Sequence, residues 1–129
     1  MNRLNRYLLD TDVLVEYLRN QEQAIAYVDS LEGDLLVSAV SVAELYVGAR
    51  SDLERKLLDD FVSALTVIAV DGAIARQGGL YRQQYKQSHG TGFNDALLAA
   101  TAELLGVEFI SFNQRHFPML SNLVVPYKR

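Results

Sequence analysis

The stretch Tyr7-Leu8-Leu9-Asp10-Thr11-Asp12-Val13-Leu14-Val15 joins a short apolar run to a helical pattern through an acidic triplet. Residues 7–9 are typical of a buried strand that ends at Asp10. A helix follows, with Asp12 as its expected N-cap. Its apolar residues are spaced so that they share one face: Val13, Leu14, Tyr17 and Leu18. A strand that passes directly into a helix is the first half of a βαβ unit.

The same alternation continues along the chain. Further strands are expected at residues 35–37, 66–70, 107–112 and 123–125, and helices at 22–31, 42–50, 52–64, 73–87 and 95–105. Gly78-Gly79 inside one helical pattern indicates a kink. Continuous apolar strands separated by helices predict a parallel sheet that helices cover on both faces, the α/β class.

Size and composition narrow the class of protein. A chain of 129 residues fits one domain, 1–129, which buries roughly two-thirds of its unfolded surface. No apolar run approaches the roughly 20 residues of a membrane span, and Asp10 interrupts the only candidate secretion signal. The absence of cysteine favours a reducing compartment, so we expect a cytoplasmic protein without membrane contact. A net charge of −4 disfavours a protein that coats nucleic acid, but not an enzyme with a cation-filled acidic pocket.

Four polar residues are expected at the same edge of the sheet. Asp10 ends the first strand, and Asn113 follows the fourth. Glu44 lies in the first turn of the helix after the second strand, and Asp95 opens the helix that leads into the fourth. In open α/β sheets, ligands bind beyond the carboxyl ends of the strands, at a switch point in strand order. This edge is therefore the predicted site.

Each residue also has a purely structural interpretation. Asp10 and Asp12 are suitable helix caps, and Ser41 with Glu44 matches a capping box. An acid such as Asp95 is favoured at the positive end of a helix, and Asn113-Gln114 is typical of a turn.

Together these acids are harder to explain structurally. At a separation of about 5 Å, each carboxylate pair repels by roughly 3 kcal/mol at an effective dielectric constant near 20. A helix cap gains only about 1 kcal/mol, so such a cluster needs a proton or a cation. Oxygen ligands without cysteine or paired histidine favour Mg²⁺ or Mn²⁺, which also bind phosphate oxygens. The pattern predicts a site that cleaves phosphodiesters.

Four motifs in order resemble the PIN-domain ribonucleases, and more narrowly the VapC-type toxins of bacterial and archaeal toxin–antitoxin pairs. They are residues 7–15, Ser41-Val42-Ala43-Glu44-Leu45-Tyr46-Val47-Gly48-Ala49, Asp95-Ala96-Leu97-Leu98-Ala99-Ala100-Thr101-Ala102 and Ile110-Ser111-Phe112-Asn113-Gln114-Arg115-His116-Phe117. The resemblance implies a five-stranded parallel sheet, a Mg²⁺ or Mn²⁺ site, hydrolysis of single-stranded RNA, a homodimer and an antitoxin partner.

The resemblance also implies roles for individual residues. Asp10, Glu44 and Asp95 match the family's three best-marked acids, which hold the cation directly or through water. Asp12, Ser111 and Asn113 are the supporting, water-orienting residues. The chain departs from the family at Asn113, where a fourth Asp is frequent, and at His116, where another acid is frequent. One-metal and two-metal chemistry therefore both stay open.

Basic residues near the motifs are candidate RNA contacts. Arg115 and His116 lie in the last motif, and Arg82 and Lys86 lie one turn apart on a predicted helix. Each is also typical of a solvated surface. A dimer interface is expected on the early helices, which carry Tyr17, Leu18, Tyr27 and Val28, although the same stripe suits a domain core.

Two alternative functions compete with the nuclease. Asp10-Thr11-Asp12 after a strand resembles the start of a haloacid-dehalogenase-like phosphatase, but no late acidic pair follows and the chain is short for that fold. A degenerate PIN domain that binds RNA without cleaving it is the non-enzymatic alternative. A departure at Asn113 favours that alternative, and the three retained acids disfavour it.

Overall fold

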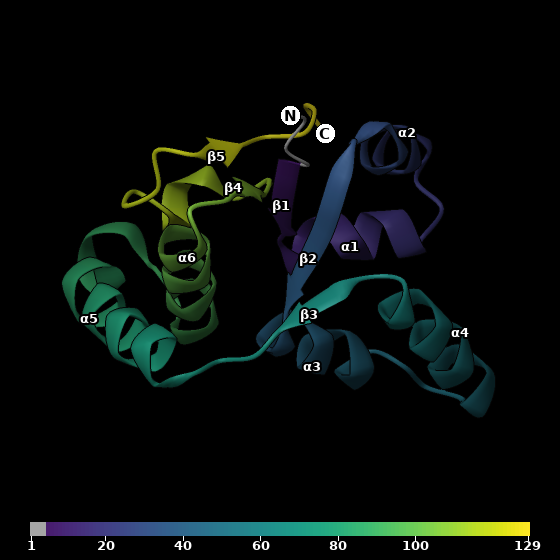
Figure 1. The fold of residues 1–129 in the computed structure, drawn as a ribbon, viewed down its shortest axis with the longest axis horizontal. Helices are drawn as coiled ribbons and strands as arrows, with labels where there is room; N and C mark the ends of the chain where they lie inside the picture. The colour runs from purple at the N-terminus through teal and green to yellow at the C-terminus, as the bar shows by residue number, and fades with distance from the viewer. Residues whose placement is uncertain (1–4) are drawn as a thin grey trace.

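A computed structural model describes residues 5–129, in which parallel strands form one sheet with the order β3-β2-β1-β4-β5 (Figure 1). The strands are β1 (Asn5–Leu9), β2 (Gly33–Ser38), β3 (Thr66–Ile68), β4 (Glu108–Ile110) and β5 (Leu123–Val124). The predicted α/β class with a five-stranded parallel sheet is confirmed.

The helices cover both faces of this sheet (Figure 1). They are α1 (Thr11–Leu18), α2 (Glu22–Ser30), α3 (Ala39–Val47), α4 (Asp52–Ser63), α5 (Gly72–His89) and α6 (Phe93–Leu105), and a short 3₁₀ helix, η1 (Gln114–His116), follows β4. No helix within residues 5–129 is long and apolar enough to cross a membrane.

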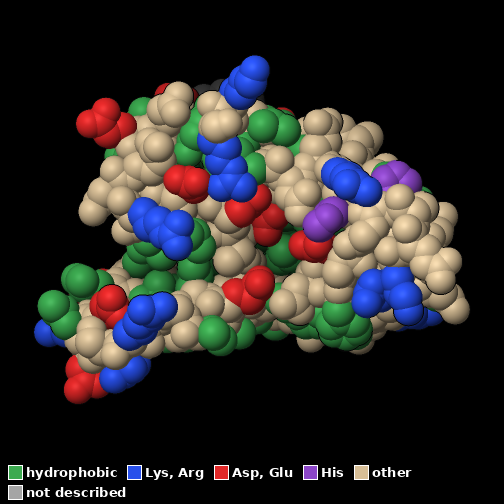
Figure 2. All heavy atoms as spheres, turned by 180° about the vertical axis from the view of Figure 1, so that it is seen from behind, with side chains coloured by type: hydrophobic (Ala, Val, Ile, Leu, Met, Phe, Trp, Pro, Cys, Tyr) green, Lys and Arg blue, Asp and Glu red, His purple; other side chains and the backbone are tan. Residues whose placement is uncertain are grey.

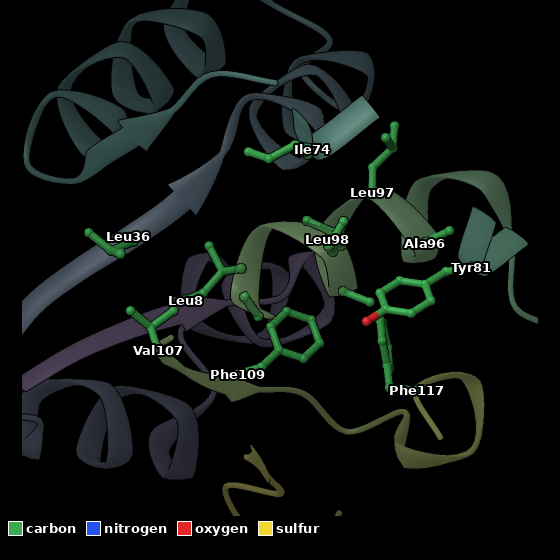
Figure 3. Close-up of a cluster of buried hydrophobic side chains, with 13 residues drawn as sticks. Leu8, Leu36, Ile74, Tyr81, Ala96, Leu97, Leu98, Val107, Phe109 and Phe117 are labelled. Atoms are coloured by element: carbon green, nitrogen blue, oxygen red, sulfur yellow. The ribbon is translucent and has the colours of Figure 1, made fainter. Parts of the chain in front are cut away.

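Alternating side chains of the strands build two hydrophobic cores. Leu8, Leu36 and Phe109 point to one face, where they pack with α5 and α6 (Figure 3). Leu9, Val37 and Ile110 point to the other face, where they pack with residues of α1 to α4. Because both faces of the sheet are buried there, the buried parts of β1, β2 and β4 are continuous apolar runs and not alternations of apolar and polar residues.

Two helices begin earlier than the sequence predicted, because each is capped by the last residue of the preceding strand or by the residue directly after it. The N-cap of α1 is Asp10 and not Asp12, and its side chain accepts a hydrogen bond from the Thr11 amide. The N-cap of α3 is Ser38, whose hydroxyl accepts from the Val40 amide. The predicted capping box of Ser41 and Glu44 is therefore wrong, and Glu44 lies in the second turn of α3 and not in its first.

Two strands are shorter than predicted because their partners end. Ile68 of β3 pairs with Ser38, the last residue of β2, so residues 69 and 70 have no strand to pair with. Ile110 of β4 pairs with Leu9, the last residue of β1. The helix predicted to end at Arg50 ends three residues earlier, at Val47, and the remaining strand and helix bounds lie within two residues of the prediction.

The helix predicted across Gly78-Gly79 forms, and α5 is continuous from Gly72 to His89. Gly78 is the place where α5 approaches α6. A Cβ atom at Gly78 would lie 2.7 Å from Leu97 Cδ2 and 3.2 Å from Leu97 Cα, whereas one at Gly79 would meet nothing within 4 Å. The first glycine allows close helix packing, and the second is not needed for it.

The strand order reverses beside β1, which places a switch point between β1 and β4. The chain runs from β1 outward through β2 to β3, and then returns to the other side of β1 as β4. At the carboxyl end of this pair, the Asp10 amide donates to the Ile110 carbonyl at 2.9 Å. The predicted site edge is therefore the edge at which β1 and β4 end.

Candidate metal centre

Asp10 is buried at the end of β1, with a hydrogen bond to each carboxylate oxygen. The Thr11 amide donates to Oδ1 at 2.7 Å, and the Ser111 hydroxyl donates to Oδ2 at 2.7 Å. Ser111 is itself fixed, because its Oγ accepts from the Asn113 amide at 3.0 Å. Ser111 and Asn113, which belong to the last sequence motif, thus hold Asp10 of the first motif in place.

The surroundings of Asp10 oppose its negative charge. Burial, followed by the nearby charge of Asp12, raises its pKa to about 7; the hydrogen bonds from Ser111 and Thr11 lower the pKa, and the charge of Asp95 raises it. A cation at this site would replace the proton and relieve the same repulsion.

Asp12 has one oxygen held by the protein and one without a partner. The Phe112 amide donates to Oδ2 at 3.1 Å, whereas Oδ1 is buried and forms no hydrogen bond within residues 5–129. Burial raises the pKa of Asp12 as well. A buried carboxylate oxygen without a donor is unfavourable, so this atom is a place where a cation or its water would be stabilised.

Glu44 reaches the site through a pair of hydroxyl groups. Thr11 Oγ1 lies 2.9 Å from Glu44 Oε1 and 2.8 Å from the Oγ of buried Ser41. A carboxylate only accepts, so Thr11 donates to Glu44 and accepts from Ser41. Glu44 itself is exposed, which leaves its other oxygen accessible.

Asp95 lies in the first turn of α6, which begins at Phe93 and not at Asp95 as predicted. Its Oδ2 accepts from the Gly92 amide at 3.3 Å and lies 3.0 Å from His116 Nδ1. Its Oδ1 accepts no hydrogen bond from the described part of the chain. Asp95 is thus also a residue that stabilises the start of a helix, as its structural interpretation predicted. That role involves only one of its two carboxylate oxygens, Oδ2.

The acidic side chains gather on one face, with Lys, Arg and His side chains on both sides (Figure 2). Within residues 5–129, no three His, Asp or Glu side chains are close enough to hold a metal ion by themselves. The side chains alone therefore do not form the close cluster of carboxylates that the sequence predicted. Mg²⁺ keeps several waters and needs only one or two direct carboxylates, so the all-oxygen set and the unpartnered Asp12 Oδ1 still fit such an ion.

Two of the predicted RNA contacts are occupied by internal hydrogen bonds. Arg82 donates from Nη1 to the Thr91 carbonyl at 3.0 Å, and His116 contacts Asp95. Lys86 and Arg115 are exposed and remain candidate RNA contacts. Thr11 and Thr91 take part in these contacts although the sequence did not predict it. The position of Thr11 between Asp10 and Asp12 is the one sequence feature that could have indicated its role, and no sequence feature indicated the role of buried Thr91.

Arg129 adds a positive charge beside the acids. Arg129 donates to Glu16 Oε1 at 2.9 Å, and its guanidinium lies 4.3 Å from the centre of the Phe112 ring. Its charge contributes to lowering the pKa of Asp12, against the larger effect of burial. Phe112 also packs edge-on against Tyr127, with ring centres 5.0 Å apart. This packing holds the residue whose amide binds Asp12.

A pocket of about 400 Å³ lies next to Glu44, between α1, α3 and α4. Its lining is mostly apolar and includes the exposed side chains of Leu18 and Leu57. Leu18 is the only residue of the expected dimer stripe that is exposed. Tyr17, Tyr27 and Val28 pack in the second core, and Tyr17 stacks on Phe61. The core interpretation thus holds for buried Val28, whereas Tyr17 and Tyr27 pack on the core and stay partly exposed.

Comparisons with known proteins agree with this geometry. The PIN domain matches residues 7–121. Two Mycobacterium tuberculosis proteins are similar to the chain: ribonuclease VapC10 is 35% identical and covers 93% of this chain and 92% of its own. Ribonuclease VapC19 is 36% identical, and the match covers 93% of this chain and 98% of VapC19. A toxin–antitoxin complex from Klebsiella pneumoniae contains a chain of similar structure, with a TM-score of 0.84, 25% identity and coverage of 95% and 99%.

Proposed function

The chain belongs to the PIN-domain family, and we propose that it is a Mg²⁺- or Mn²⁺-dependent endoribonuclease that hydrolyses phosphodiester bonds of single-stranded RNA. The observation that carries this proposal is how the acids are held. Asp12, Glu44 and Asp95 each have one oxygen fixed by a protein donor, while the other accepts no hydrogen bond within residues 5–129. Metal ligands are commonly oriented in this way by a second layer of hydrogen bonds.

The proposed roles are those that the family resemblance implies for these residues. Asp10, Glu44 and Asp95 hold the cation, directly or through water, and Asp12, Ser111 and Asn113 position the residues and waters around it. When bound, the cation supplies Lewis-acid chemistry for attack on the phosphodiester. Ser111 and the Thr11 amide keep the Asp10 carboxylate in one orientation. Asp10 must lose its proton near neutral pH before it binds a cation, because its pKa is about 7.

We further propose that the chain is the toxin of a toxin–antitoxin pair. The supporting findings are the similarity to VapC ribonucleases and to a chain in a toxin–antitoxin complex. The pocket beside Glu44 is the proposed antitoxin site, since it is apolar, open and adjacent to an acid of the site. An apolar antitoxin segment that fills it would also reach the cation site. A homodimer remains expected, and light scattering at micromolar concentration tests it.

Cleavage of a fluorescent single-stranded RNA tests the enzymatic proposal. We expect cleavage in Mg²⁺ or Mn²⁺, loss of cleavage in excess EDTA, and recovery when the metal is restored. RNA binding without cleavage under all of these conditions would instead support a degenerate, non-catalytic PIN domain. Turnover of p-nitrophenyl phosphate, measured in parallel, would point to a phosphatase.

A further inference from the structure

His116 is a half-buried residue of the last motif that contacts Asp95. Its side chain is 33% exposed, and its Nδ1 lies 3.0 Å from Asp95 Oδ2. The other ring nitrogen, Nε2, faces the backbone of Gly90, where an added Cβ would lie 3.6 Å from it. The imidazole is therefore placed between the α5–α6 turn and Asp95.

The position of this ring is fixed through its own backbone. Fully buried Thr91 donates from Oγ1 to the His116 carbonyl at 2.7 Å, and the Thr91 carbonyl accepts from Arg82 at 3.0 Å. The Asn113 side-chain amide lies 2.6 Å from His116 Nδ1. A continuous polar chain thus runs from Arg82 on α5, through Thr91 and His116, to Asp95 on α6.

The hydrogen bond between His116 and Asp95 has a defined direction. The Asp95 carboxylate only accepts, so Nδ1 of His116 donates the proton in this bond. The Asn113 side-chain nitrogen, 2.6 Å from the same Nδ1, is also a donor, so that second contact is a hydrogen bond only if the Asn113 amide is turned to present its oxygen. The other donor to Oδ2, the Gly92 amide, is 3.3 Å away, which is long for a hydrogen bond from nitrogen to oxygen. His116 is therefore the nearer of the two groups that hold Oδ2, and Oδ1 has no hydrogen-bond partner among residues 5–129.

We propose that His116 is a positioning residue that holds Asp95 Oδ2 so that Oδ1 is presented to the cation, and not a residue that binds RNA. The inference rests on the proposed function, because it assigns a role within the same cation site. The hydrogen bonds from Arg82 through Thr91 fix the position of the His116 ring. The orientation of Asp95 therefore does not depend on α6 alone.

Two substitutions of His116 test this role. His116→Ala removes the donor, whereas His116→Asn keeps an N–H donor near the position of Nδ1. The matched control is His89→Ala, since His89 is the only other histidine and its Nδ1 contacts Ser88. Circular dichroism and thermal melts of the metal-free proteins show whether each variant folds.

The main measurement is Mn²⁺ affinity by calorimetry without RNA. Loss of a group that orients a metal ligand typically weakens affinity or activity 10- to 100-fold. We expect about a tenfold weaker Mn²⁺ affinity for His116→Ala, substantial recovery in His116→Asn, and wild-type affinity in His89→Ala. RNA cleavage by His116→Ala at a fixed metal concentration should show a lower kcat with an unchanged KM. ¹⁵N NMR of the metal-free wild type at pH 8 should show the proton on Nδ1 of His116.

Several outcomes would overturn the inference. A folded His116→Ala with wild-type Mn²⁺ affinity, or one whose only defect is a raised KM for RNA, would exclude the positioning role. If His116→Asn folds but binds Mn²⁺ as weakly as His116→Ala, the hydrogen bond to Asp95 does not determine the Mn²⁺ affinity. If the wild type neither binds Mn²⁺ nor cleaves RNA, the proposed function fails as well. If the wild type binds Mn²⁺ and cleaves RNA, and His116→Ala has the same Mn²⁺ affinity, only the positioning role of His116 fails.

Discussion

At the residue scale, the acids of the site differ in what holds them. Both oxygens of Asp10 are occupied by protein donors, whereas Asp95 keeps Oδ1 without one. Asp10 is also the more deeply buried, with 6% of its surface exposed, against 25% of the Asp95 side chain. Asp95 is therefore the acid whose change should affect function most and folding least.

We predict that Asp95→Asn reduces RNA cleavage at least a hundredfold while the free energy of unfolding changes by only about 1 kcal/mol. The amide keeps the shape and one acceptor for His116 or Gly92, but it removes the charge that binds a cation. A fluorescent-RNA assay in Mg²⁺ and circular dichroism measure the two quantities. Wild-type turnover by a folded variant would remove Asp95 from the site.

Asp10 should make the stability of the metal-free protein depend on pH. Its pKa is about 7 in the folded chain, and roughly 4 is usual for an unfolded Asp. Between these values only the folded state binds the proton, so protonation stabilises the fold. This stabilisation is complete below about pH 4 and disappears as pH rises through 7, at no more than about 1.4 kcal/mol per pH unit.

Thermal melts between pH 5 and pH 8 test this prediction. We expect the melting temperature of the metal-free wild type to fall over this range, and Asp10→Asn to show a smaller fall. Mn²⁺ affinity of the wild type should rise over the same range, because the proton competes with the cation. Parallel melting curves for both proteins would show that Asp10 is already ionised at pH 5.

At the scale of the elements, the contact between α5 and α6 positions Asp95 and His116 relative to one another. These two helices share the first core, and Gly78 allows them to approach closely. The neighbouring Gly79 is open to solvent. The two glycines of α5 therefore give a matched pair for testing this packing.

We predict opposite effects of alanine at these two positions. Gly78→Ala should lower the free energy of unfolding by about 1–3 kcal/mol, because the new methyl group overlaps Leu97, including its Cα. Gly79→Ala should raise it by about 0.5–1 kcal/mol, because alanine restricts the unfolded chain and suits a helix. Urea unfolding measures both values. Equal midpoints for the two variants would contradict the packing argument.

At the scale of the whole molecule, the pocket beside Glu44 connects the cation site to an open apolar surface of α1, α3 and α4. Leu57 lines this pocket and is 60% exposed, whereas Leu53 on the same helix is 67% exposed and lies outside its lining. Substitutions at these two positions therefore distinguish binding in the pocket from a general effect of removing an exposed apolar side chain.

We predict that Leu57→Ala weakens binding of the antitoxin about tenfold, while Leu53→Ala leaves it unchanged. Neither substitution should alter RNA cleavage, since neither side chain touches the acids. The protein encoded by a short reading frame directly upstream is the natural candidate partner, and calorimetry measures its affinity. Equal affinities of both variants would place the antitoxin elsewhere.

The sequence by itself determined the class of fold and the edge of the sheet that carries the site. Both depend on local patterns, because apolar periodicity distinguishes strands from helices and the acids directly follow or precede these elements. Boundaries failed where a residue at the end of a strand or directly after it also caps a helix, as at Ser38 and Asp10. Whether such a residue ends a strand or begins a helix depends on where its partner strand stops.

Only the tertiary structure decided which oxygen of each acid is held and by which donor. Ser111 lies 101 residues from Asp10, and the Phe112 amide lies 100 residues from the Asp12 side chain that it binds. These contacts exist because β1 and β4 pair in one register, and the contact of His116 with Asp95 links the last motif to α6 in the same way. Hydrogen bonds require positions accurate to a fraction of an ångström, and distances along the chain carry no such information.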